Sequence, residues 1–180
     1  GVVDADIYGF SVPRMLGVAH RPTQVDDMIL PPEAHDVKVI SIGMFVPGNQ
    51  PVVWRGPMLH RALQQFLTDV FWGDLDVLLL DLPPGTGDIQ LTLAQKVPVA
   101  GSVIVTTPQD LALIDATRAI DLFDKAAVPI LGLIENMAGY ACPHCGEVSD
   151  PFGAGGVEAA AARLSLRWPA RPGTCMSRWG

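Results

Sequence analysis

The chain has 180 residues, of which 49% are hydrophobic and 17% are charged; this composition excludes a disordered chain and suits one domain with a substantial core. Its 12 basic and 19 acidic residues give a net charge of -7 without any local cluster of Lys and Arg, which argues against direct binding to nucleic acid. Three cysteines are too few for a disulfide framework, and no apolar run reaches the roughly 18 residues of a membrane span, so we expect a soluble protein of a reducing, intracellular compartment.

Apolar segments alternate with amphipathic ones along the chain and predict strands and helices in turn. The opening residues, 1–6, have the pattern of the end of a strand and lack an initiating methionine, so we expect the chain to be a fragment. Further strands are predicted at 37–42, 77–82, 102–106 and 130–135.

Two helices are predicted between these strands. The helix at 57–71 begins with proline, and its apolar residues recur at spacings of three and four at Leu59, Leu63, Phe66 and Val70. The helix at 110–126 has the same periodicity at Leu113, Ala116, Ile120 and Phe123. Asp110 can serve as its N-cap or as an acid of its first turn. Alternation of strands and helices predicts an α/β fold with a doubly wound, mainly parallel sheet.

The domain organisation follows from the same patterns. Residues 1–164 are expected to form one domain, since the Pro/Gly pairs within them mark surface loops. Residues 165–180 are rich in Arg, Trp and Pro and lack periodicity where another strand would be due. We expect this tail to be poorly ordered.

The strongest chemical signal is Asp81, which follows an unbroken apolar run and precedes a loop rich in Gly and Pro. The run at 77–80 does not alternate, as expected of a strand buried on both faces, so Asp81 emerges at the carboxyl end of the sheet, where ligands bind. There it could hold a water of a magnesium shell, while the backbone of Gly85, Thr86 and Gly87 approaches a γ-phosphate. The alternative is an ordinary turn at the end of a strand.

Two further acids, Asp4 and Asp6, stand at the end of the opening strand. Asp6 is the better catalytic candidate, because it lies at the loop, where a carboxylate could orient an attacking water. The alternative is that both are solvated loop acids.

Cys142 and Cys145 form a Cys-x-x-Cys pair, a spacing that lets two thiolates reach one metal. Zinc, an iron-sulfur cluster and a redox pair all use this spacing. A four-thiolate site needs two more ligands, and the only other cysteine, Cys175, lies in the tail. The simplest completion is a site between subunits, with two cysteines from each of two chains.

Asn136 follows the predicted strand at 130–135, which puts a side-chain amide at the carboxyl edge of the sheet. An amide both donates and accepts hydrogen bonds, which suits adenine. The alternative is a turn asparagine.

Taken together, these segments resemble the Mrp/ApbC (Nbp/Ind-type) iron-sulfur cluster carrier ATPases, of the MinD/ParA-like P-loop NTPases. The matching order extends to about residue 164. The segments are Asp4-Ala-Asp-Ile-Tyr-Gly9, Trp54-Arg-Gly-Pro57, Asp81-Leu-Pro-Pro-Gly-Thr-Gly-Asp88, Thr106-Thr-Pro-Gln-Asp110, Glu135-Asn-Met137, Cys142-Pro-His-Cys145 and Phe152-Gly-Ala-Gly-Gly156.

The resemblance implies a homodimeric ATPase that uses ATP and Mg²⁺, carries a 4Fe-4S cluster across the dimer and passes it to apo iron-sulfur proteins. The roles implied are a water-positioning acid for Asp6, a Walker B acid for Asp81, a switch loop for Gly85, Thr86 and Gly87, an adenine contact for Asn136, and cluster ligands for Cys142 and Cys145. The charge distribution predicts no nucleic-acid partner, and without a visible C-terminal amphipathic helix we expect no stable membrane association. The implied location is the bacterial-type cytoplasm, or the mitochondrial matrix where a transit peptide precedes Gly1.

The chain departs from the family pattern in three places. No Gly-rich loop ending in Gly-Lys-Ser/Thr occurs in these residues, so we expect ATP hydrolysis by a full-length family member and impaired hydrolysis by this fragment. The sequence after Leu164 bears no resemblance to the family, and Phe10 stands where the family usually has proline.

Two other readings compete with a cluster carrier. A MinD/ParA-like positioning or regulatory ATPase would use the same switch loops, although the cysteine pair argues against it. A zinc-stabilised interaction domain would use Cys142 and Cys145 and need no role for Asp81.

Overall fold

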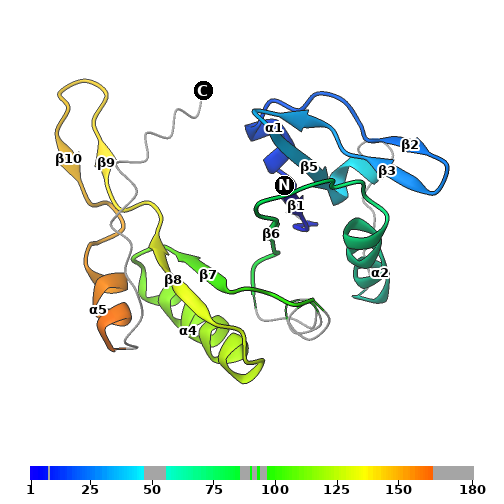
Figure 1. The fold of residues 1–180 in the computed structure, drawn as a ribbon. Helices are drawn as coiled ribbons and strands as arrows, with labels where there is room; N and C mark the ends of the chain where they lie inside the picture. The colour runs from blue at the N-terminus through cyan, green and yellow to red at the C-terminus, as the bar shows by residue number, and fades with distance from the viewer. Residues whose placement is uncertain (8, 47–55, 86–89, 91–92, 94–96, 164–180) are drawn as a thin grey trace. The chain divides into compact units, whose positions relative to one another are not determined.

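The computed structural model describes residues 1–7, 9–46, 56–85, 90, 93 and 97–163 (Figure 1). The chain divides into two compact units, Gly1–Pro84 and Gly85–Gly180. Each unit has its own strands and its own helix packing.

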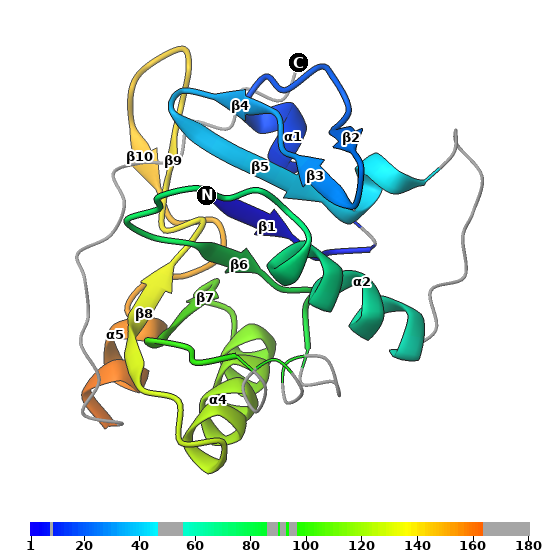
Figure 2. The same ribbon diagram turned by 45° about the vertical axis from the view of Figure 1, so that its right-hand side comes forward.

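The first unit is built on a four-stranded sheet with β1 in its interior, as Figure 2 shows. Strand β1 pairs in parallel with both β5 and β6, and β4 pairs antiparallel with β5. A separate antiparallel hairpin joins β2 to β3. In chain order the elements are β1 (Val2–Asp4), α1 (Val12–Met15), β2 (Thr23–Val25), β3 (Met28–Leu30), β4 (Glu33–Ala34), β5 (Val37–Ser41), the 3-10 helix η1 (Ile42–Phe45), α2 (Gly56–Thr68) and β6 (Leu79–Asp81).

Helix α2 buries the apolar stripe that its sequence predicts. Its residues Leu59, Leu63 and Phe66 are buried, as is Val70 just beyond the end of the helix. The buried residues of the sheet are Val3, Ala5, Val39 and Ile40. The helix predicted at 57–71 is confirmed, with its end three residues earlier than expected.

Strand β6 differs from the prediction in length and in burial. It covers Leu79–Asp81, whereas the sequence predicted a strand at 77–82. Val77 is 61% exposed and Leu79 is 60% exposed, so the run is not buried on both faces. In the described residues β6 is an edge strand that pairs only with β1, and Val77 lies before its start.

The second unit contains a parallel strand pair covered by two helices. The strands predicted at 102–106 and 130–135 are confirmed as β7 and β8, which pair in parallel. Helix α4 begins at Asp110, which is a first-turn acid, while Gln109 is the N-cap. The elements are β7 (Ser102–Thr106), α4 (Asp110–Lys125), β8 (Ile130–Glu135), β9 (Tyr140–Ala141), β10 (Val148–Ser149) and α5 (Gly156–Arg163).

The core of this unit joins β7, β8, α4 and α5. Ile104 and Leu133 of the strands pack with a cluster whose other buried members are Ala116, Ile120, Val157 and Ala161. Helix α5 has no counterpart in the sequence prediction. Gly156 lets its first turn approach the chain before α4, because a Cβ there would lie 2.9 Å from the carbonyl oxygen of Pro108.

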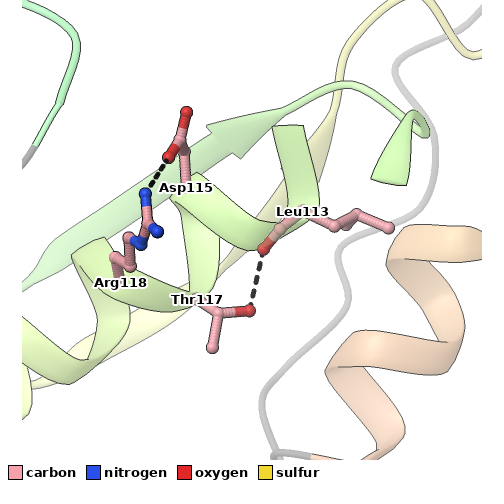
Figure 3. A network of polar contacts seen from close by, with 4 residues as sticks. All are labelled: Leu113, Asp115, Thr117 and Arg118. Atoms are coloured by element: carbon pink, nitrogen blue, oxygen red, sulfur yellow. Dashed lines mark hydrogen bonds and ion pairs between the residues drawn. The ribbon is translucent and has the colours of Figure 1, made fainter. Parts of the chain in front are cut away.

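Polar contacts on α4 lie away from this core. The hydroxyl of Thr117 donates to the carbonyl oxygen of Leu113 at 2.8 Å, while the Leu113 side chain extends toward α5 (Figure 3). Arg118 pairs with Asp115 at 3.1 Å in an exposed ion pair, which contributes little to stability.

In the part of the chain that the structure describes, no helix is long and apolar enough to cross a membrane. The tail predicted at 165–180 lies outside the described residues.

The burial difference along β8 predicts a difference in stability. Leu133 is 1% exposed, so Leu133→Ala should lower the free energy of unfolding by about 2–5 kcal/mol, the usual effect of a cavity in a packed core. Leu131 on the same strand is 53% exposed, and Leu131→Ala should change it by less than about 0.5 kcal/mol. Urea unfolding followed by circular dichroism measures both, and equal effects would contradict the packing described.

Candidate functional site

Two acids lie at the same register position at the end of the first sheet. Asp4 of β1 pairs with Asp81 of β6 in the parallel ladder. Asp6 follows β1 by two residues, and its negative charge helps to raise the pKa of Asp81. The structure therefore brings together Asp6 and Asp81, the two acids that the sequence singled out, while their catalytic role stays a prediction.

Asp4 is the buried member of this group, with no exposed surface. Its Oδ2 accepts a hydrogen bond from the hydroxyl of Ser41 at 3.0 Å, and its Oδ1 accepts from the backbone N–H of Asp6 at 3.3 Å. Burial, and to a lesser extent the charge of Asp81, raise the pKa of the Asp4 carboxyl. The hydrogen bonds from Ser41 and from the N–H groups of Asp6 and Val12 oppose that shift, but the pKa remains raised.

Asp81 lies at the exposed end of β6. Partial loss of solvent around its carboxyl, and then the charge of Asp6, raise its pKa. Carboxylate oxygens are ligands that Mg²⁺ accepts, and Mg²⁺ in nucleotide sites takes only one or two of them beside water and phosphate. The donor set at this edge therefore fits a magnesium-nucleotide site.

The loop after Asp81 is described only in part. Gly85 is exposed and has a φ of +101°, a conformation that glycine adopts without strain. Thr86 and Gly87, the other predicted phosphate contacts, lie outside the described residues.

Asn136 belongs to the second unit and lies exposed directly after β8. Its backbone N–H donates to the carbonyl oxygen of Thr106 at 2.7 Å, which ties it to the end of β7. Its side-chain oxygen accepts from the N–H of Met137 at 2.9 Å, and Met137 has a φ of +56°. The side chain thus stabilises its own turn, and a contact with adenine stays a prediction.

The cysteine pair lies on the connection between β9 and β10, which form an antiparallel hairpin. The N–H of Cys142 donates to the carbonyl oxygen of Glu147 at 2.8 Å, and the N–H of Gly146 donates to the carbonyl oxygen of Cys142 at 2.9 Å. These bonds close a tight turn that holds the half-buried Cys142 and the exposed Cys145. Neither cysteine is in a disulfide.

The turn favours the thiolate form of Cys142. The N–H groups of Cys145 and His144, followed by the thiol of Cys145, lower the pKa of the Cys142 thiol. The thiolate is the form that binds a metal. In the parts of the chain that the structure describes, however, no group of three or more His, Cys, Asp or Glu side chains gathers to hold a metal ion.

Sequence reasoning missed Ser41 and Val12, both of which act on the carboxylate of Asp4. Ser41 is the next-to-last residue of the strand predicted at 37–42 and the last residue of β5, so a hydroxyl near the carboxyl edge was the available signal. Val12 contributes only its backbone N–H, and no side-chain pattern could have indicated that.

The chain matches known proteins over nearly its whole length. The ParA family model described as "NUBPL iron-transfer P-loop NTPase" matches residues 1–171. An "Iron-sulfur cluster carrier protein" of Mycobacterium tuberculosis is 59% identical over 165 residues, which cover 92% of this chain and 43% of that protein. An "Iron-sulfur protein required for NADH dehydrogenase, mitochondrial" of Arabidopsis thaliana is 49% identical over 168 residues, which cover 93% of this chain and 54% of that protein.

The fold also matches a solved structure, a nucleotide-binding protein from Archaeoglobus fulgidus in complex with ADP. It is 35% identical with a TM-score of 0.76, and the match covers 93% of this chain and 65% of that one. This likeness confirms the predicted α/β fold with its mainly parallel strands. The chain spans less than two thirds of the length of each of these three proteins.

The register of Asp4 and Asp81 predicts coupled titration. Asp81→Asn removes one negative charge beside Asp4, so the raised pKa of the Asp4 carboxyl should move down toward 3.8. Because the folded state holds the proton more tightly, stability should fall as pH rises from 3.8 through the raised pKa of Asp4, and fall less in Asp81→Asn. Carboxyl ¹³C NMR and unfolding at several pH values measure this, and an unchanged Asp4 pKa would contradict it.

Proposed function

Because the chain belongs to the family of NUBPL iron-transfer P-loop NTPases, we propose that it is part of an ATP-dependent carrier of iron-sulfur clusters. The carrier binds a 4Fe-4S cluster at a dimer interface and transfers it to apo-proteins. The nucleotide is handled at the carboxyl edge of the first sheet, and the cluster is held at the turn between β9 and β10.

The observation that carries the proposal is the turn at Cys142 and Cys145. Backbone N–H groups of the turn lower the pKa of the Cys142 thiol and so favour the thiolate, the form that binds a metal. A pair of thiols exposed or half-exposed on a hairpin is accessible both to a cluster and to a recipient protein. This accessibility suits cargo that must be released.

A 4Fe-4S cluster takes four thiolates, and this turn offers two. The absence of a larger ligand group within the described residues supports completion by a second copy of the chain. Two copies related by a two-fold axis would present four thiolates to one cluster.

The acids at the first sheet have separate roles in this proposal. Asp81 holds a water of the Mg²⁺ shell, and Asp6 orients the water that attacks the γ-phosphate. When bound, Mg²⁺ neutralises charge on the phosphates. Gly85, Thr86 and Gly87 offer backbone N–H groups to the γ-phosphate, and Asn136 contacts adenine.

Hydrolysis is proposed for the full-length protein, because no Gly-rich loop ending in Gly-Lys-Ser/Thr occurs in these 180 residues. Nucleotide-dependent contacts at the switch loops would change the arrangement of the dimer and so the hold of four thiolates on the cluster. The proposed location is the cytoplasm or the mitochondrial matrix.

Anaerobic reconstitution with iron and sulfide tests cluster binding. The wild-type chain should take up about four irons per dimer and develop the visible absorbance of a cluster. The double variant Cys142→Ala, Cys145→Ala should lose the bound iron and the visible absorbance. The matched control Cys175→Ala should keep the bound iron and the absorbance. Circular dichroism verifies folding, and light scattering verifies the dimer. Bound zinc without a cluster would favour the interaction-domain reading, and no metal at all would favour a positioning ATPase.

Replacement of Asp6 tests the nucleotide role. In the full-length protein, Asp6→Asn should lower kcat for ATP hydrolysis by roughly 10²–10⁴-fold, because the attacking water loses the carboxylate that orients it. Asp76 is an exposed acid before the start of β6, away from its carboxyl end, so Asp76→Asn is the control and should leave kcat unchanged. A phosphate-release assay measures both variants, and equal rates in Asp6→Asn and wild type would remove Asp6 from the mechanism.

A further inference from the structure

We propose that Ser41 is a positioning residue of the nucleotide site, which fixes the carboxylate of Asp4 and, through it, the segment that carries Asp6. The proposal rests on the proposed role of Asp6 in orienting water. It adds a residue from the neighbouring strand β5 that touches neither the nucleotide nor the attacking water.

The hydroxyl of Ser41 has a defined direction. Ser41 is fully buried at the end of β5 and lies opposite Asp4 in the parallel ladder. Its oxygen accepts from the N–H of Gly43 at 3.2 Å, which makes Ser41 the N-cap of η1. A hydroxyl has one proton to donate, and this proton goes to Oδ2 of Asp4 at 3.0 Å. The position of Ser41 in β5, its bond to Gly43 and its bond to Asp4 therefore fix the direction of the hydroxyl.

The Asp4 carboxylate also binds backbone N–H groups of the residues that follow β1. Its second oxygen, Oδ1, accepts from the N–H of Asp6, and the N–H of Val12 also stabilises the carboxylate. One buried carboxylate thus contacts both Asp6 and Val12. Within the segment 6–12 the Asp6 carboxylate lies close to the backbone of Gly9, since a Cβ there would be 3.0 Å from Asp6 Oδ2.

A further contact joins Phe10, which follows β1, to Gly43 of η1. The side chain of Phe10 occupies the space where a Cβ of Gly43 would lie. Gly43 is also the residue whose N–H binds Ser41. Phe10 therefore contacts η1 at Gly43, while the Ser41–Asp4 hydrogen bond joins the ends of β5 and β1.

The groups beside Asp4 explain why the Ser41 hydroxyl affects the charged form of the Asp4 carboxyl. Asp81 lies beside Asp4 on the β6 side and disfavours its charged form, whereas Ser41 on the β5 side is a hydrogen-bond donor that favours it. A buried carboxylate that loses a donor loses both stabilisation and orientation. The N–H of Asp6 is then held less firmly.

A double-mutant cycle in the full-length protein tests this positioning role. Ser41→Ala should lower kcat for ATP hydrolysis about tenfold, equivalent to about 1.4 kcal/mol, with KM for ATP changed less than about twofold. In an Asp4→Ala background, Ser41→Ala should change kcat less than about twofold, because the oxygen that accepts its hydrogen bond is gone. Thr68→Ala removes an exposed hydroxyl that donates to the Asp69 carboxylate at 2.6 Å, and this matched control should leave kcat unchanged.

Ser41→Cys keeps the shape of the side chain with a slightly larger atom and a weaker donor and should give an intermediate kcat, so it carries the test if Ser41→Ala does not fold. Equal losses of kcat from Ser41→Ala in both backgrounds would overturn the proposal, since they would show a role independent of Asp4.

Amide hydrogen exchange at Asp6, measured by NMR without nucleotide, separates this inference from the proposed function. Exchange should be faster in Ser41→Ala and Ser41→Cys than in wild type, because the acceptor of the Asp6 N–H is held less firmly. Unchanged exchange would overturn the positioning role. A wild-type protein that fails to hydrolyse ATP would overturn the proposed function, while the exchange result would still decide whether Ser41 positions the segment.

Discussion

The parallel pairing of β1 with both β5 and β6 is the constraint on which the candidate nucleotide site depends. It sets Ser41, Asp4 and Asp81 at one level across three strands. Parallel strands end at the same edge of a sheet, so a hydroxyl donor and two carboxylates meet there although they are far apart in the sequence. A register shift of one residue would turn these side chains to the opposite face.

This register also explains the distribution of charge. The central carboxylate, Asp4, is buried and is held by donors from Ser41, Asp6 and Val12, whereas Asp81 is exposed at the last strand. The energetic cost of burying Asp4 is therefore reduced by hydrogen bonds from Ser41 and from the N–H of Asp6, and the second of these also organises the following segment. In the proposed function, Asp6 and Asp81 face the nucleotide, and the buried Asp4 holds the chain around them.

The turn that holds Cys142 and Cys145 does not depend on long-range strand pairing, because its hydrogen bonds join residues that are close in the sequence. Two hydrogen bonds close the turn between β9 and β10, and neighbouring N–H groups stabilise the sulfur of Cys142. Such a turn needs little support from the core, and in the proposed function this suits a site whose cargo must be taken up and released. Completion of the ligand set by a second chain would make cluster binding depend on dimerisation.

The sequence by itself determined what depends on local pattern. Periodicity located α2, β7, α4 and β8 and the buried stripe of α2, and the motifs indicated Asp6, Asp81 and the cysteine pair as candidate site residues. The tertiary structure decided what depends on long-range pairing: the exposure of Val77 and Leu79, the burial of Asp4, and its bonds to Ser41 and Val12. An apolar run predicts a strand, but it does not show which strands and helices will pack beside it. A backbone donor such as the N–H of Val12 is present in every residue except proline, so the identity of the side chain cannot indicate its partner.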